Sequence, residues 1–197
     1  MGTENKKNGQ SMVELALVLP FLILLLVATV EAGFAFRDYL ILQSVNREGS
    51  RWAVRTAPGN VEYFQSEVVH EIFGRVLNAA DEAGLRTEDL DIIVTHVYID
   101  DDGPAYKSIA SPGFDANNSR LNLVSIAQDN ADKAAQINAA RIANDFAPLA
   151  NEMVVVEVFY RHETVWGFER FNVGPLSEDW IMHAHSSMRL VGTGRTN

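Results

Sequence analysis

The stretch of sequence that decides the fold is LALVLPFLILLLVATVEAGFAF, residues Leu15–Phe36. Glu31 is its one charged residue, and its length meets the requirement of about 20 apolar residues for a membrane-spanning helix. Lys6 and Lys7 lie in the short polar segment before it, and positive charge there favours an N-terminus held in the cytoplasm. We therefore expect a single-pass membrane protein whose C-terminal part lies outside the cytoplasm.

The helical pattern continues beyond the apolar stretch. Apolar residues recur at spacings of three and four as far as Ala53, and Pro58 ends the pattern. The sequence predicts one helix from about Ser11 to Thr56, transmembrane over 10–36 and amphipathic over 37–57. Such a helix is longer than the hydrocarbon core is thick, so we expect its outer half to pack on the rest of the protein.

Composition describes the remainder as one acidic domain. The 197-residue chain has 47% apolar residues, enough for a core, and a net charge of −10, which opposes binding to nucleic acid. It has no cysteine, which excludes disulfide scaffolds, Cys-ligated metals and cysteine nucleophiles. No internal repeat divides residues 58–197, so we expect a single soluble, extracytoplasmic head.

Residues 58–197 alternate between helix and strand patterns. Asp, Gly, Pro, Ser and Asn gather in residues 100–120, which predicts a long surface loop. The expected helices are 61–83, capped by Asn60, and 125–146, and the expected strands are 89–100, 153–163 and, after a bend around Gly167, 180–191. The expected fold class is α+β, with the long N-terminal helix packed on a small, mainly antiparallel sheet with two further helices.

Two residues of the apolar helix need an explanation. Glu14 lies one turn into the segment, where a carboxylate costs about 2.5–3.5 kcal/mol at mid-membrane and so needs a partner. If the chain were cut after Gly9, the new α-amino group of Gln10 would lie beside this carboxylate, within one chain or between neighbours. Pro20 removes one backbone donor, which predicts a kink and a carbonyl that neighbouring helices satisfy. The simpler alternatives are that Glu14 reaches the inner headgroups and that Pro20 is tolerated in a lone anchor.

The run Gly9-Gln10-Ser11-Met12-Val13-Glu14 before the apolar helix resembles the processing site of type IV prepilins. The longer run GQSMVELALVLPFLILLLVATVEAGFAFRDYLILQSVNREGSRWAVR resembles the TadE-like family of pseudopilins from tight-adherence (Flp-type) pilus systems. This resemblance implies a leader over residues 1–9, a prepilin peptidase that cuts between Gly9 and Gln10, and a pilin-like helix.

The resemblance also implies a place and a set of partners. The expected place is the bacterial inner membrane, with incorporation into a surface pilus as a further step. The expected partners are the peptidase, membrane lipid, the inner-membrane assembly platform, and other pilin or pseudopilin subunits held through the N-terminal helix. Glu14 and Pro20 would then set register and assembly.

Candidate chemistry in the head is sparse. Asp100-Asp101-Asp102-Gly103 offers oxygen ligands for calcium but lacks the spacing of an EF-hand, so we interpret it as a solvated turn. His183 and His185 share one face of a strand without an evident third zinc ligand, so we expect packed or outward-facing histidines. The sequence has no catalytic motif, and we expect no enzyme activity, cofactor or metal.

Two other functions fit the same residues. The first is a secreted binding protein whose segment 15–32 is a cleaved signal, because Val30-Glu31-Ala32 has small residues where a signal peptidase reads. The second is an envelope protein that keeps its membrane anchor permanently. The N-terminus of the mature protein separates these two from the processed pseudopilin.

Overall fold

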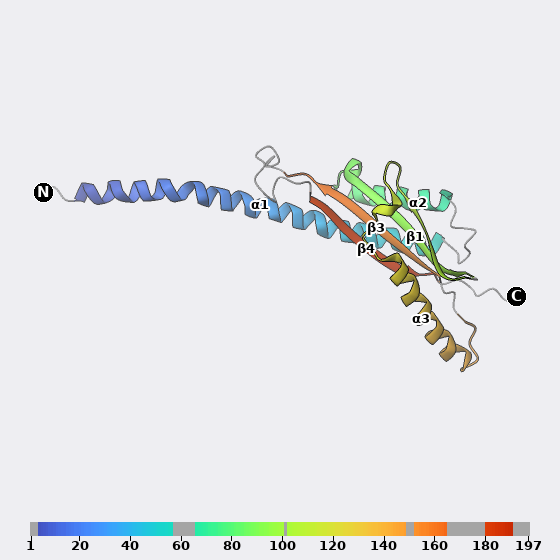
Figure 1. The fold of residues 1–197 in the computed structure, drawn as a ribbon. Coiled ribbons are helices and arrows are strands. Elements are labelled where there is room, and N and C mark those ends of the chain that lie inside the picture. The colour runs from blue at the N-terminus through green and yellow to red at the C-terminus, as the bar shows by residue number, and fades with distance from the viewer. Residues whose placement is uncertain (1–3, 57–65, 101, 149–151, 165–179, 191–197) are drawn as a thin grey trace. The chain divides into compact units, whose positions relative to one another are not determined.

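The computed structural model describes residues 4–56, 66–100, 102–148, 152–164 and 180–190 (Figure 1). The chain forms two compact units. The first contains the N-terminal helix as far as Asp38, and the second contains Tyr39–His162 and the last strand. We call the second the sheet unit. Predictions that involve Asn60 and Gly167 lie outside the described residues.

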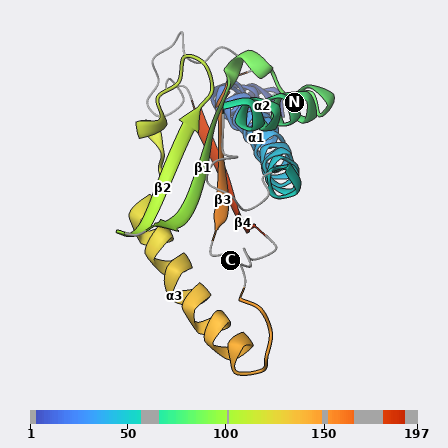
Figure 2. The ribbon, with the colours of Figure 1, turned by 90° about the vertical axis from the view of Figure 1, so that its right-hand side faces the viewer.

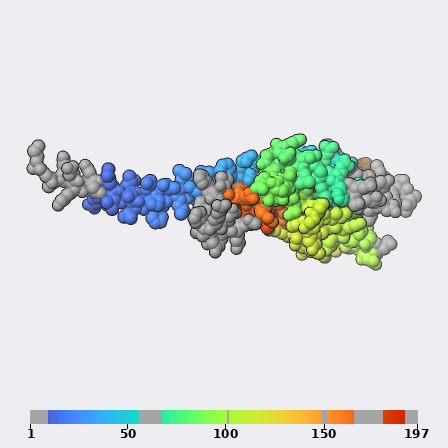
Figure 3. All heavy atoms as spheres, turned by 90° about the horizontal axis from the view of Figure 1, so that it is seen from above, coloured from blue at the N-terminus to red at the C-terminus, as the bar shows by residue number. Residues whose placement is uncertain are grey.

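The N-terminal helix α1 runs from Glu4 to Thr56, so its end agrees with the prediction and its start lies earlier than Ser11. Pro20 lies inside it without ending it. In the first unit the large apolar side chains of 12–26 are exposed, and Figure 3 shows this part of α1 in blue. Among the described residues, α1 is the one helix that is long and apolar enough to cross a membrane.

The sheet unit is built on four antiparallel strands in the order β2-β1-β3-β4. Their bounds are Leu90–Asp100 (β1), Gly103–Ala110 (β2), Met153–His162 (β3) and Trp180–Arg189 (β4). The loop predicted over 100–120 is therefore wrong in part, because its residues 103–110 form β2. Asp100 pairs with Gly103 across a tight turn, and the strand continues to a pairing of Ile93 with Ala110.

One face of the sheet holds the main core. Alternate residues of the strands, such as Ile92, Val156 and Ala184, point to this face and pack against helices α1 and α2. Helix α2 runs from Ser66 to Glu82 and buries Val69, Ile72, Phe73, Val76 and Ala80, which recur at spacings of three and four. Figure 2 shows α1 and α2 together on this side of the sheet.

The opposite face is covered at one end by helix α3, Leu123–Ile142. Asn122 caps this helix, since its side-chain oxygen accepts a hydrogen bond from the Ser125 amide at 3.0 Å. Ala127 packs there against Val97 and Val155, residues of the face opposite to the main core. Together with the long N-terminal helix, these elements confirm the predicted α+β fold.

Candidate functional site

The predicted processing site lies in the first turns of α1. The backbone is helical at Gly9, and Gln10 follows in the same helix. The Gln10 side-chain amide donates a hydrogen bond to the Glu14 carboxylate at 3.4 Å, and both side chains are exposed. In the uncut chain, therefore, Glu14 already interacts with residue 10 across one helical turn. The pairing of Glu14 with a free amine after cleavage stays a prediction.

One acidic residue of the first unit is buried within the protein. The Glu31 side chain is 3% exposed, and Ala35 and Asp38 on the same side of the helix are buried as well. Spacings of four and three place these residues on one covered face of α1.

In the sheet unit, α1 makes a polar contact with the sheet through Asn46 and Ser50. The Asn46 amide nitrogen donates to the backbone oxygens of Val156 at 2.9 Å and Ala184 at 3.3 Å. The Ser50 hydroxyl bonds the Asn46 backbone oxygen at 3.0 Å and contacts the Ser186 hydroxyl. Because both side chains are buried and Asn46 is bonded to backbone oxygens of two strands, the contact fixes the axial position of α1 on the strands.

Gly49 lies between these polar residues and allows α1 and α2 to approach closely. A Cβ atom at this position would lie 2.3 Å from the Cγ2 atom of Val76 on α2. Ala53, one turn later, is fully buried. Small and amide side chains at spacings of three and four thus form one buried face of α1, with Asn46 and Ser50 against the strands and Gly49 against α2. We call Asn46, Gly49, Ser50 and Ala53 together the α1–sheet contact. This contact explains the run Asn46–Ala53 that carried part of the resemblance.

The comparison with known families covers the same stretch of helix. Residues 9–51 match the model of the TadE-like protein family. The resemblance stated from the sequence is thereby confirmed for this segment. No curated protein matches the chain, and no solved structure matches it either.

The TadE-like segment begins at the predicted processing site and ends within the α1–sheet contact. It therefore contains Gly9, Gln10, Glu14 and Pro20, all of the residues that the sequence singled out for processing and assembly. The strands and the helices α2 and α3 lie beyond it, so their chemistry has to be read from the structure alone.

A buried carboxylate cluster beyond the TadE-like segment was missed by the sequence reasoning. Glu157 of β3 is completely buried on the sheet face opposite to α1. Its carboxylate accepts hydrogen bonds from the Ser119 hydroxyl at 2.5 Å and the Arg120 amide at 3.1 Å, and it contacts the His183 Nε2 atom at 3.0 Å. The signal was a lone acid in the apolar run Val154–Tyr160.

The cluster fastens the loop after β2 to the sheet. Burial lowers the pKa of His183, and the nearby charges of His185 and Arg120 act in the same direction, although the Glu157 carboxylate opposes them. His183 also stacks on Phe159, with ring centroids 4.8 Å apart. Ser119 donates to the carboxylate and not to an imidazole, so the arrangement lacks the order of a nucleophile and its base.

The sequence predicts no metal site at His183 and His185 or at the Asp run at the end of β1, and the structure shows the contacts that the described members of these groups make. The imidazole rings of His183 and His185 stack with their centroids 5.5 Å apart. Among the described residues, no group of three His, Cys, Asp or Glu side chains is arranged to hold a metal ion. The Asp100 carboxylate instead accepts the Asp102 amide at 3.0 Å and so stabilises the turn between β1 and β2. Asp101 lies outside the described residues.

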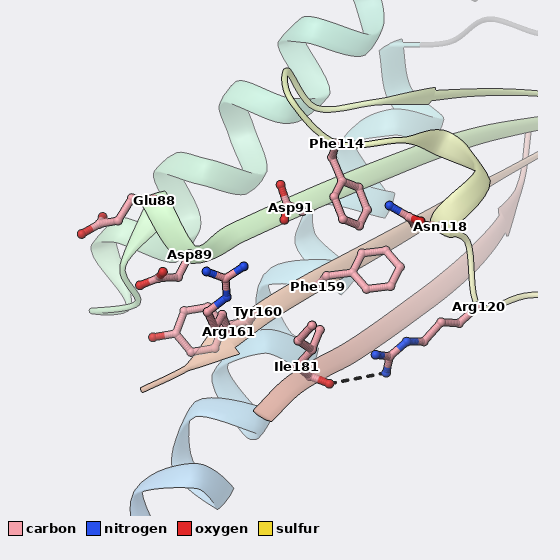
Figure 4. Close-up of a pocket in the computed structure, with 10 residues that line it drawn as sticks. All are labelled: Glu88, Asp89, Asp91, Phe114, Asn118, Arg120, Phe159, Tyr160, Arg161 and Ile181. Atoms are coloured by element: carbon pink, nitrogen blue, oxygen red, sulfur yellow. Dashed lines mark hydrogen bonds between the residues drawn. The ribbon is translucent and has the colours of Figure 1, made fainter. Parts of the chain in front are cut away.

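A pocket of about 400 Å³ lies beside the cluster (Figure 4). The rings of Phe114 and Phe159 lie in it with their centroids 5.2 Å apart. The Cζ atom of Arg120 lies 5.8 Å from the centroid of the Phe159 ring. The other lining residues are Glu88, Asp89, Asp91, Asn118, Tyr160, Arg161 and Ile181. A backbone hydrogen bond, and then Arg86, lower the pKa of Glu88. The pocket mixes aromatic rings with charges of both signs and contains no evident reactive pair.

Proposed function

We propose that this protein is a non-catalytic minor pilin or pseudopilin of a tight-adherence (Flp-type) pilus. A prepilin peptidase would remove residues 1–9, and the mature chain would act in pilus assembly or as a subunit. The observation that carries the proposal is the coincidence of the TadE-like match, residues 9–51, with a helix whose apolar side chains are exposed over 12–26. Exposed apolar surface of this extent requires lipid or neighbouring helices.

The N-terminal helix would serve in two successive environments. Before assembly it anchors the chain in the inner membrane, with the lysines before the span on the cytoplasmic side and the sheet unit outside the cytoplasm. In the pilus it packs against the helices of other subunits, where the Glu14 carboxylate and the amine of Gln10 would fix the axial register. Pro20 leaves a carbonyl that a neighbouring helix can satisfy.

The α1–sheet contact supports a mechanical role for the outer half of the helix. Asn46 and Ser50 are bonded to strand backbone and to Ser186, so the sheet unit is held in one register on α1. A force applied to the outer half of the helix would therefore pass to the strands through these hydrogen bonds. The inner-membrane assembly platform and the peptidase are the partners that this sequence of events requires.

The test is the mass of the N-terminal peptide of the protein recovered from native membranes. A start at Gln10, lost in cells without the peptidase, supports the processed pseudopilin. A start at Gly33 would instead give a secreted domain, and an uncut Met1 would give a permanent anchor, so either result overturns the proposal. Gly9→Val should block the cut. Gly33→Ala is the matched control, because a Cβ atom at Gly33 meets nothing within 4 Å.

A further inference from the structure

Strand β4 forms one edge of the sheet, and half of its backbone groups point away from β3. The Leu190 amide bonds the Glu152 oxygen at 2.9 Å, which places residue 190 in a hydrogen-bonded pair with β3. In an antiparallel ladder every second residue points the same way, so the even-numbered residues of β4 point to β3 and the odd-numbered residues point outward. We call the outward N–H and C=O groups of His183, His185 and Ser187 the β4 edge.

The β4 edge has no backbone hydrogen-bond partner in the described part of the chain. Among the described strands β4 pairs with β3 alone, and no other described backbone group bonds these three residues. His185 and Ser187 are also exposed. The edge therefore offers a row of donors and acceptors to an extended backbone, the arrangement to which a further strand adds.

Side chains from the loop after β2 and from α3 hold the two ends of β4. Arg120 donates to the Ile181 oxygen at 3.4 Å, as Figure 4 shows, and Arg189 donates to the Asn130 side chain at 3.3 Å. The β4 edge lies between these two contacts. Because the strand is fixed at both ends, a partner would meet a preformed edge and lose less entropy than in the pairing of two flexible segments.

The sequence of β4 also lacks the features that protect an unused edge strand, such as proline, lysine or a bulge. Residues Trp180–Arg189 contain no proline, glycine, lysine or acidic residue, and their pairing with β3 is continuous. The other edge differs. The Ser111 amide bonds the Ile92 oxygen, so Pro104 of β2 is at an outward position, where it supplies no N–H. One edge of the sheet is thus hindered and the other is open.

A second copy of this chain does not suit the β4 edge. A two-fold pair of β4 strands is antiparallel, so it would make the outer halves of the two α1 helices run in opposite directions. Copies inserted in one membrane with the same orientation leave it in the same direction. A head-to-tail row would instead join β4 to β2 of the next copy, where Pro104 removes a donor.

We propose that the β4 edge binds an extended segment of a different protein, which adds to the four-stranded sheet as a further strand. The side chains of that segment would alternate between the two faces of the sheet. Those on one face would lie beside Ala184, which is buried in the main core, and those on the other beside the exposed His185. The segment therefore alternates apolar and polar residues. This partner goes beyond the proposed function, which requires contacts of the N-terminal helix only.

Hydrogen exchange of the full-length chain tests the proposal. The exchange of single amides is measured by mass spectrometry for the tagged protein in native membranes, where its partners are present, and for the same protein purified in detergent. The amides of His185 and Ser187 should exchange roughly tenfold more slowly in native membranes. Tyr106 and Ser108 of β2 are the matched control, because their amides point outward from the hindered edge and should exchange equally in both samples.

Two substitutions at Ser187 separate the backbone from the side chain. Ser187→Pro removes one outward donor, a change that edge strands tolerate, and should make the His185 amide exchange roughly tenfold faster in native membranes. Ser187→Ala keeps the donor and should leave that exchange slow. Slow exchange of the buried Val94 amide in β1 shows that each variant is folded. If Ser187→Pro does not fold, the comparison of the two wild-type samples decides alone.

A cross-link identifies the partner. In the same membranes, p-benzoylphenylalanine in place of Ser187 should form an adduct with a protein other than this chain, within a segment of alternating apolar and polar residues. An adduct between two copies of this chain would overturn the proposal.

Equal exchange of the His185 amide in native membranes and in detergent would also overturn it. So would slow exchange in the purified protein at every dilution, which would assign the edge to a segment of the same chain. If exchange is equal while the chain starts at Gln10, the added strand is wrong and the proposed function stands. If exchange is slow only in native membranes but the chain is never cut, the added strand is supported and the processing is wrong.

Discussion

Replacing Gly49 by alanine tests the close approach of α1 and α2. In an exposed helix this change stabilises by about 1 kcal/mol, because alanine has the higher helix propensity. At Gly49 the added Cβ atom would lie 2.3 Å from Cγ2 of the fully buried Val76, a branched side chain that cannot rotate away. Overpacking of this kind costs about 1–3 kcal/mol, and so short a contact belongs in the upper part of that range. We therefore expect a net destabilisation of about 1–2 kcal/mol.

The measurement is thermal unfolding of the full-length protein in detergent, followed by tryptophan fluorescence, to which Trp52 beside the contact contributes. A domain of this size shifts by about 2–4 °C per kcal/mol, so Tm should fall by roughly 2–8 °C. Gly74→Ala is the matched control, because a Cβ atom at Gly74 meets nothing within 4 Å, and that variant should raise Tm by about 1–4 °C. If both variants raise Tm, the close approach of the two helices is refuted.

Three further predictions follow from the polar groups. Ser119→Ala should destabilise the protein by about 1.5–3 kcal/mol, the value of a hydrogen bond to a buried charge, whereas Ser125→Ala at an exposed site should change Tm little. Burial lowers the pKa of His183 in the folded state, so protonation of this histidine opposes folding. The stability of the folded protein should therefore decrease as the pH falls below the unfolded-state pKa of about 6.5. Tm measured at pH 7.5 and 5.5 should therefore differ more in the wild type than in His183→Gln; equal differences would contradict this assignment. Glu14→Leu should leave membrane insertion intact, measured by carbonate extraction, while decreasing incorporation into filaments, and unchanged incorporation would count against a register role.

The sequence predicted the elements whose periodicity is unbroken. The apolar run and the spacings after it predicted α1, and the alternation from Ile92 to Ile99 predicted β1. Strand β2 was missed because Gly103–Ala110 has a proline, a lysine and few large apolar residues, which resembles a loop. Its strand conformation comes from pairing with β1, a tertiary effect that propensity does not contain.

The candidate site was predictable only where its residues are close in sequence. Gln10 and Glu14 lie one helical turn apart, so their proximity follows from the helix itself. Glu157 lies 38 residues from Ser119 and 26 from His183, and only the sheet and the loop after β2 bring these three together. The apolar residues at the end of α3 also fit a regular helical pattern in the sequence. That pattern does not predict that the end of α3 extends beyond the sheet and is not buried there.

The two edges of the sheet differ in how readily they could pair with a strand of another copy. At the β2 edge, Pro104 lacks a backbone donor and Lys107 carries charge. At the other side, the carbonyl of Ala184 that Asn46 of α1 bonds points toward β3, so this bond does not cover the outer edge of β4. Subunits concentrated in a membrane before assembly would otherwise be able to add strand to strand and aggregate. The proline and the lysine hinder that reaction at the β2 edge, so copies concentrated in a membrane are kept from joining strand to strand there.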